Sequence, residues 1–275
     1  MSSRFPDPRA LARCLLLALA AMSSADAADA GRVLRVCADP DNLPYSHQDE
    51  SGFENRIAAI VADELGASLQ YEWQPLRRGF VRKTMGTGRC DVFIGVPAGF
   101  ERVLTTQPYY RSSYVFVWRR GDDAPHSFAD PRIATQPIGV QLVGNDMAAT
   151  PPGHALARAG ALSNVIGYPV YGDRPAASRM IKALASHAID SALLWGPQAG
   201  YFARRAAVPM EMAIADAPAG LQAPFEFAIA MGVARGNAVL RDELDAVLRH
   251  RRNDIDAVLA QYAVPRTDPG QENTR

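Results

Sequence analysis

Short apolar runs alternate along the chain with segments in which apolar residues recur every three or four positions. Runs at residues 32–38, 68–76 and 90–97 predict buried strands, and the segments between them predict an amphipathic helix and a short helix. The longer helix carries Phe53, Ile57, Ile60, Val61 and Leu65 on one face. This order predicts a βαβαβ unit with parallel strands and right-handed crossovers.

The same alternation restarts after an apolar run that begins near Tyr114. Strands are expected at residues 137–143, 164–171, 189–197, 208–215 and 225–237, helices at residues 150–160 and 176–188, and two further amphipathic helices after residue 238. We therefore expect an α/β, bilobal fold with two parallel-rich βα lobes and two hinge crossings, near residues 110–114 and 223–227. Lobe 1 comprises residues 31–113 plus 228–264, lobe 2 comprises residues 114–227, and residues 265–275 form a disordered tail.

The N-terminus has the pattern of a secretory signal peptide. Arg4, Arg9 and Arg13 precede an apolar run at residues 14–22, which is too short to span a bilayer, and small residues follow at 25–27. We expect cleavage after residue 27, with residues 28–30 as an alternative site. No later segment predicts a membrane anchor, so the mature chain is expected in the periplasm.

Two cysteines remain after removal of this signal. Cys37 and Cys90 are 53 positions apart, a spacing that fits neither a zinc site nor a haem-attachment motif. In exported proteins such cysteine pairs are usually oxidised to disulfides. The usual 2-1-3 strand order would also place the strands predicted at residues 32–38 and 90–97 side by side, close enough for a disulfide. We expect a Cys37–Cys90 disulfide; two free buried thiols are the alternative.

The overall charge is balanced, with 29 lysines and arginines against 29 aspartates and glutamates. This balance gives no reason to expect nucleic acid or an anionic membrane surface as a partner. Any partner recognised by charge must therefore meet a local patch. One candidate patch is the basic run Arg77, Arg78, Arg82 and Lys83, although a solvated helix start explains it equally well.

Polar and aromatic residues follow the predicted strands, where the strand ends of a bilobal fold face the cleft. The candidates for contact with a ligand or partner are Asp39, Asn42, Tyr45, Arg77, Arg78, Pro97, Tyr109, Gln141, Asn145, Asp146 and Trp195. Aspartate, asparagine and proline also favour plain turns, which remain the alternative reading for residues 39–45 and 143–146.

Enzyme motifs are missing from the sequence. It contains no GxSxG, HExxH, P-loop or CxxCH pattern, and its five histidines do not have the spacing of metal ligands. We therefore expect neither catalysis nor a bound metal or cofactor.

Several long segments resemble a known family. GVQLVGND, ERVLTTQPYYRSSYVFVWRR and MGVARGN resemble type II periplasmic solute-binding proteins of the polar amino-acid class. More narrowly, RVCADPDNLPYS, GRCDVFIGVPAGFERVLTTQPYYRS, TPPGHALARAG and WGPQAGYFA are similar to the J-type subfamily (MxaJ/XoxJ-type), whose members accompany quinoprotein methanol dehydrogenases in the periplasm.

The sequence departs from the amino-acid receptors where those proteins hold their ligand. The resemblance implies an arginine before the Thr-x-Pro-Tyr element, but Arg102 lies too close to Thr105 and Thr106. Trp195 stands where the receptors place the aspartate that binds the substrate ammonium. Losing that charge-assisted hydrogen bond removes about 1.5–3 kcal/mol, so recognition of a free amino acid is not expected.

The resemblance thus implies a periplasmic accessory protein for a PQQ-dependent, methanol-type alcohol dehydrogenase. Such a protein would assist maturation or activation of the dehydrogenase, or its coupling to cytochrome c. The alternative function is that of a receptor that delivers a small polar solute to an ABC transporter. In either case, the cleft between the lobes is the expected place for a small-molecule ligand.

Overall fold

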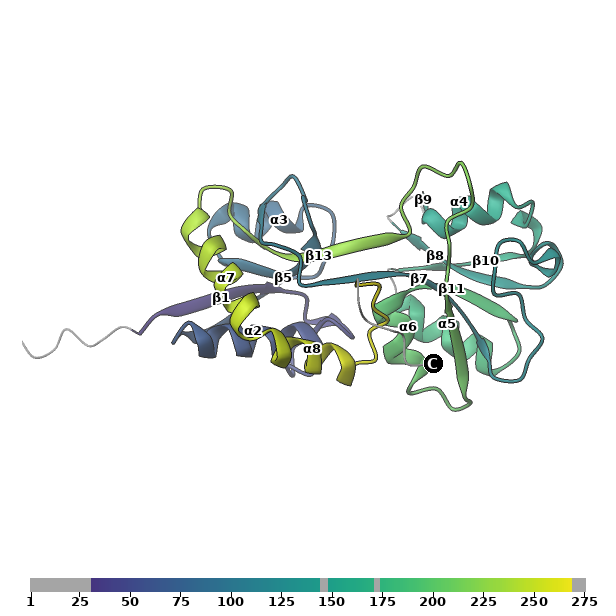
Figure 1. Ribbon diagram of the computed structural model, residues 1–275, viewed down its shortest axis with the longest axis horizontal. Helices are drawn as coiled ribbons and strands as arrows, with labels where there is room; N and C mark the ends of the chain where they lie inside the picture. The colour runs from purple at the N-terminus through teal and green to yellow at the C-terminus, as the bar shows by residue number, and fades with distance from the viewer. Residues whose placement is uncertain (1–30, 144–147, 171–173, 269–275) are drawn as a thin grey trace, which may run out of the picture.

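The computed structural model describes residues 31–143, 148–170 and 174–268, and within them the chain forms two lobes side by side (Figure 1). The predicted signal peptide, and Asn145 and Asp146 among the predicted site residues, lie outside the described residues. Two long strands, β7 (Tyr110–Arg119) and β13 (Glu226–Val233), run between the lobes (Figure 1).

Lobe 1 is assembled from both ends of the described chain. Its other elements are β1 (Val33–Ala38), β2 (Asp41–Asn42), β3 (Ser46–His47), α2 (Phe53–Glu64), β4 (Ser68–Trp73), α3 (Phe80–Lys83), η1 (Met85–Thr87), β5 (Val92–Pro97), β6 (Leu104–Thr105), α7 (Ala238–His250) and α8 (Arg252–Gln261).

Lobe 2 is assembled from the middle of the chain. Its elements are η2 (Pro131–Ala134), β8 (Ile138–Val143), β9 (Ala148–Ala149), α4 (Pro151–Arg158), η3 (Leu162–Asn164), β10 (Val165–Pro169), α5 (Ala176–Ala185), β11 (Ser191–Trp195), α6 (Gly196–Ala203) and β12 (Met210–Ile214).

One sheet passes through both lobes in the order β10-β8-β11-β7-β13-β5-β1-β4. The predicted 2-1-3 order is confirmed, because β1 lies between β4 and β5 and is parallel to both. β7 changes partner midway: Tyr110–Ser113 pairs with β13, and Tyr114–Trp118 pairs with β11, both antiparallel. Because β7 and β13 belong to both lobes, the boundaries at residues 113/114 and 227/228 remain predictions.

Alternating side chains give the sheet two packed faces in each lobe. In lobe 1, Val36 faces α2, α7 and α8, while the neighbouring Cys37 faces α3. In lobe 2, Leu194 packs with α5 and α6, while Leu193 packs with α4 on the other face. Figure 1 shows these helices on opposite sides of the sheet. The fold is therefore the expected α/β architecture with helices on both faces of a parallel-rich sheet.

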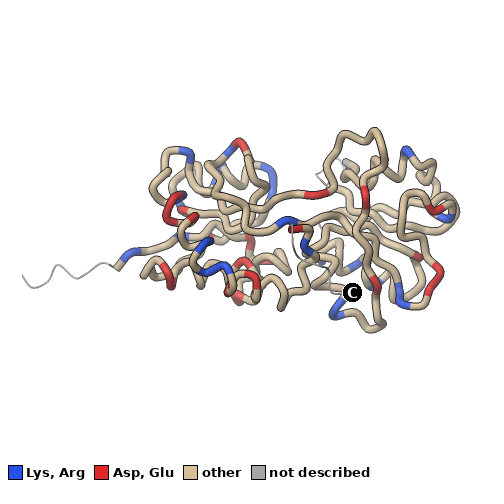
Figure 2. The backbone as a smooth tube through the Cα atoms, in the orientation of Figure 1, with Lys and Arg blue, Asp and Glu red and all other residues tan. Residues whose placement is uncertain are grey.

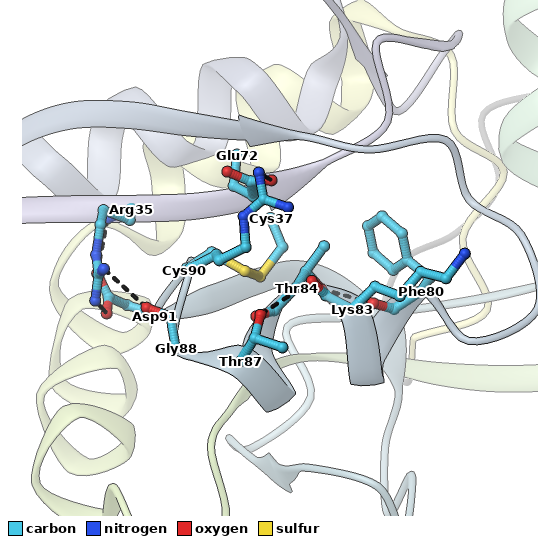
Figure 3. The surroundings of a disulfide bond; sticks show 11 residues. Arg35, Cys37, Glu72, Phe80, Lys83, Thr84, Thr87, Gly88, Cys90 and Asp91 are labelled. Atoms are coloured by element: carbon cyan, nitrogen blue, oxygen red, sulfur yellow. Dashed lines mark hydrogen bonds and ion pairs between the residues drawn. A yellow bond between two sulfur atoms is a disulfide. The ribbon is translucent and has the colours of Figure 1, made fainter.

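The expected disulfide joins Cys37 to Cys90, with 5.4 Å between their Cα atoms. It lies beside Phe80 of α3 and Thr84, the residue that follows this helix, and an Arg35–Asp91 ion pair flanks it (Figure 3). Closing a loop with this sequence separation of 53 stabilises a fold by roughly 4 kcal/mol in the chain-entropy model. The bond therefore holds the end of β1 against the start of β5.

Two segments differ from the sequence expectations. α6 forms directly after β11, where no helix is predicted; it packs on β7 and α5 through small residues and only a few large apolar ones. Residues 265–268, expected in a disordered tail, make contacts: the Ser112 hydroxyl donates to the Pro265 carbonyl at 2.6 Å, and Arg266 pairs with Asp256 and Asp268. Short polar segments like this one carry no periodic signal.

Candidate functional site

A cavity of about 800 Å³ opens between the two lobes. It is lined by the ends of β1, β5, β8 and β11 and by the loops after β1 and β4. The start of α2, residues of β7 and β13, and the segment before α5 complete the lining. This is the position predicted for the cleft, because the carboxyl ends of the parallel strands of both lobes meet there.

The loop after β1 forms one wall of the cavity and is fixed by its own backbone. Asp39 accepts hydrogen bonds from the backbone N–H of Asp41 at 2.9 Å and of Leu76 at 2.5 Å. The Ser46 hydroxyl donates to the Asp39 carbonyl at 2.8 Å. Asp39 therefore positions this loop against the loop after β4, and both of its carboxylate oxygens are engaged in doing so.

Glu54 is the acidic residue set deepest in the site. It lies in the first turn of α2, and its carboxylate lies against Gly95 of β5, where a Cβ atom would stand 2.1 Å from Oε1. Burial raises the pKa of Glu54 to about 8. No side-chain hydrogen bond or ion pair joins it to any residue that the structure describes. At neutral pH the carboxyl group is therefore mostly protonated.

Aromatic rings surround this carboxyl group. Tyr45 and Tyr110 line the cavity, and burial raises the pKa of both hydroxyls well above the ordinary value, with Glu54 adding to the shift. Across the cleft, Trp195 makes edge contacts with Tyr114 and Phe227, with ring centroids 5.4 and 5.5 Å apart. The centre of the cavity thus combines one carboxyl group with aromatic surface from both lobes.

Lobe 2 contributes a polar wall. The Gln141 side chain donates to Gln198 at 2.9 Å, and the Thr150 hydroxyl donates to the Gln141 carbonyl at 3.1 Å. Arg174 lies exposed in the lining, as does Arg77 from lobe 1. Within the described part of the chain, neither arginine has an ion-pair partner. Figure 2 shows charges of both signs distributed over both lobes.

The structure brings most of the described candidates together. The cavity is lined by Asp39, Asn42, Tyr45, Arg77, Pro97, Gln141 and Trp195. Tyr109 and Arg78 are not part of the lining. Tyr109 is 1% exposed and donates its hydroxyl to the Ile94 carbonyl, and Arg78 is exposed just before the turn at Gly79. Tyr110, at the start of β7, is equally buried and packs in the same core as Tyr109, but its side chain also borders the cavity.

Sequence reasoning missed Glu54, Tyr110, Tyr114, Arg174 and Gln198 as lining residues. Glu54 had a usable signal, because it shares the helical stripe of Ile57, Ala58 and Val61, where an acidic residue is out of place. The other residues lie within strands, helices or connections whose pattern indicates only burial or exposure.

Two kinds of site are not found in the described residues. No group of three or more histidine, cysteine, aspartate or glutamate side chains is arranged to hold a metal ion in residues 31–143, 148–170 and 174–268. Within the same residues, every helix is too short or too polar to cross a bilayer.

Comparisons with known proteins agree with this geometry. Residues 34–264 match the model of the bacterial extracellular solute-binding proteins, family 3. A protein named MoxJ from Methylorubrum extorquens is 33% identical over 261 residues, covering 86% of this chain and 82% of the relative. Another MoxJ, from Paracoccus denitrificans, is 30% identical over 266 residues, covering 90% and 93%. The crystal structure of the periplasmic binding protein XoxJ from Methylobacterium extorquens AM1 is 38% identical, with a TM-score of 0.71, covering 86% of this chain and 100% of that one.

Proposed function

Because the chain belongs to the bacterial extracellular solute-binding proteins of family 3, and within them to the MoxJ type, we propose that it is a non-catalytic accessory protein of a quinoprotein methanol dehydrogenase. The observation that carries this proposal is similarity to MoxJ and XoxJ over nearly the whole chain. We place the protein in the periplasm, to which the predicted signal peptide at residues 1–27 would direct it.

The partner is a PQQ-dependent alcohol dehydrogenase, and the role is assistance in its maturation or activation, or in its coupling to cytochrome c. The site supports a binding role over a catalytic one. Its polar side chains bind each other or the backbone, as Asp39 and Gln141 do, and no nucleophile with an adjacent base lines the described cavity.

Affinity capture tests the partnership. The tagged mature chain is immobilised and exposed to a quinoprotein methanol dehydrogenase with and without PQQ, and separately to its cytochrome c. A family 3 amino-acid receptor with the same tag serves as the control. We expect retention of the dehydrogenase by this chain alone. If neither form of the dehydrogenase is retained above the control, the proposal is wrong.

A second function, delivery of a solute to an ABC transporter, is favoured by one observation. The cavity of about 800 Å³ lies within the size range of small-molecule sites. A thermal-shift series over amino acids, alcohols, organic acids, PQQ and lanthanide ions tests it. A melting temperature that rises with ligand concentration, as expected for tight binding, would support this function. A flat response over the whole series would count against it.

A further inference from the structure

The cavity holds a carboxyl group without a partner of its own. Glu54 lies against Gly95 and among tyrosine rings, and it has no ion pair within the described chain. Glu54 is half-buried and faces the cavity. Ionising a carboxyl group so far removed from bulk water is costly, and a cationic ligand in the cavity would supply the missing counter-charge. The carboxyl group is therefore a candidate for contact with a positively charged ligand.

The charged side chains that line the cavity also favour a positively charged ligand. The charged side chains that share the cavity are Asp39, Asp41, Glu54, Arg77 and Arg174. While Glu54 is protonated, two negative charges face two positive ones. When Glu54 ionises, one negative charge is in excess, and a ligand with one positive charge restores the balance. An anionic ligand would raise the imbalance and would meet Glu54 at its centre.

The aromatic side chains of the cavity favour an organic cation over a metal ion. Ring faces attract organic cations through their quadrupoles, and a set of aromatic residues is the usual way to bind alkylated ammonium ions. A hard metal ion instead needs several oxygen ligands, and no such group occurs among the described residues. Tyr45, Tyr110, Tyr114, Trp195 and Phe227 supply aromatic surface to this cavity.

We propose that the inter-lobe cavity binds a small organic cation of the alkylated ammonium class, with Glu54 as its counter-ion and the aromatic side chains of both lobes around its alkyl groups. This inference concerns the cavity alone and does not rest on association with a dehydrogenase. Failure of either test leaves the other proposal in place.

Binding is linked to a proton. Below pH 8 the free protein carries its proton on Glu54, and a cation beside the carboxyl group favours the ionised form. Binding of one ligand molecule is therefore accompanied by release of one proton from Glu54 to the buffer. The other titratable groups facing Glu54 are Tyr45, Tyr71, Tyr109 and Tyr110, whose pKa values are all raised, so these hydroxyls remain neutral in this range. The other charged side chains that line the cavity are Asp39, Asp41, Arg77 and Arg174.

Titration calorimetry with choline tests the proposal, with the uncharged isostere 3,3-dimethylbutan-1-ol as the matched ligand. We expect choline to bind at least about tenfold more tightly than the alcohol, and its affinity to rise roughly tenfold or more between pH 6 and pH 9. Measurements at pH 7 in buffers of different ionisation enthalpy should show release of close to one proton.

Two variants complete the test. Glu54→Gln should lower the choline affinity about tenfold and abolish proton release, whereas Glu101→Gln, at an exposed position outside the cavity, should change neither. The wild-type proton release is informative even if Glu54→Gln folds poorly. Equal affinity for the alcohol and choline, or choline binding without proton release, would overturn the inference, as would no binding of choline at pH 9.

Discussion

At the scale of single residues, Glu54 makes the stability of the fold depend on pH near neutrality. Its carboxyl group has a pKa near 8 in the folded protein against an ordinary value of 4.5. Between these two pH values the unfolded chain has released this proton and the folded chain retains it. The free energy of unfolding therefore falls as the pH rises through this window.

Glu54→Gln should remove this decline. We expect the variant to gain stability relative to the wild type, on the order of 3 kcal/mol, between pH 5 and pH 9. The difference is small at pH 5, because the Glu54 carboxyl group is protonated in the folded wild type there and, like the glutamine side chain, carries no charge. Urea unfolding at several pH values measures it, with Glu101→Gln as the control. Parallel pH curves for the wild type and Glu54→Gln would contradict the assignment.

Tyr109 and Tyr110 show what sequence can and cannot predict at this scale. The sequence predicts Tyr109 at the cleft, whereas Tyr110 is the residue that borders it. A shift of one position in the register of β7 is enough to exchange two neighbouring residues in this way. The register follows from the pairing of Tyr110 with Ile229, a residue 119 positions away. No local pattern contains that information.

At the scale of elements, the strands and helices with clear periodicity are found at the expected places. β1, β4 and β5 follow the predicted order, and this strand order is what makes the Cys37–Cys90 disulfide predictable from the sequence. α6 could not be predicted, because its sequence GPQAGYFA contains two glycines and its apolar residues do not recur at a clear helical period. Its helix depends on packing, which only the folded molecule supplies.

Close packing explains why α6 contains glycine. A Cβ atom at Gly200 would lie 1.8 Å from the carbonyl oxygen of Ala263, a backbone atom in the segment that leads from α8 to the chain end. The same segment accepts the Ser112 hydrogen bond from β7. Gly200 thus allows the C-terminal segment of lobe 1 to lie directly on a helix of lobe 2.

Gly200→Ala should therefore destabilise the protein by about 1–3 kcal/mol, although alanine is the better helix former. Gly236→Ala is the matched control, because a Cβ atom there meets nothing within 4 Å. Urea unfolding compares the two variants. If Gly200→Ala is as stable as the wild type, the C-terminal segment does not pack on α6 as described.

At the scale of the whole molecule, the two lobes share a strand, and neither lobe can lose that strand without breaking the sheet of the other. β7 pairs with β13 through its first residues and with β11 through the next ones, so one strand completes both halves of the sheet. A lobe that unfolded by itself would expose part of the core of its neighbour.

We therefore expect one cooperative unfolding transition rather than two. Scanning calorimetry of the oxidised protein should give a calorimetric enthalpy equal to the van't Hoff enthalpy. Two resolved peaks, or a van't Hoff enthalpy near half the calorimetric value, would show that the lobes unfold independently in spite of the shared strand.

The position of β13 in the sheet also governs when this protein can fold during its synthesis. β13 lies between β5 and β7, and the helices α7 and α8 that cover β1 and β5 come after it in the chain. The first lobe to be synthesised is thus the last to be completed, since nearly the whole polypeptide must emerge before its core can close. The core of lobe 1 therefore closes only when the last strand and the last two helices of the described chain are present.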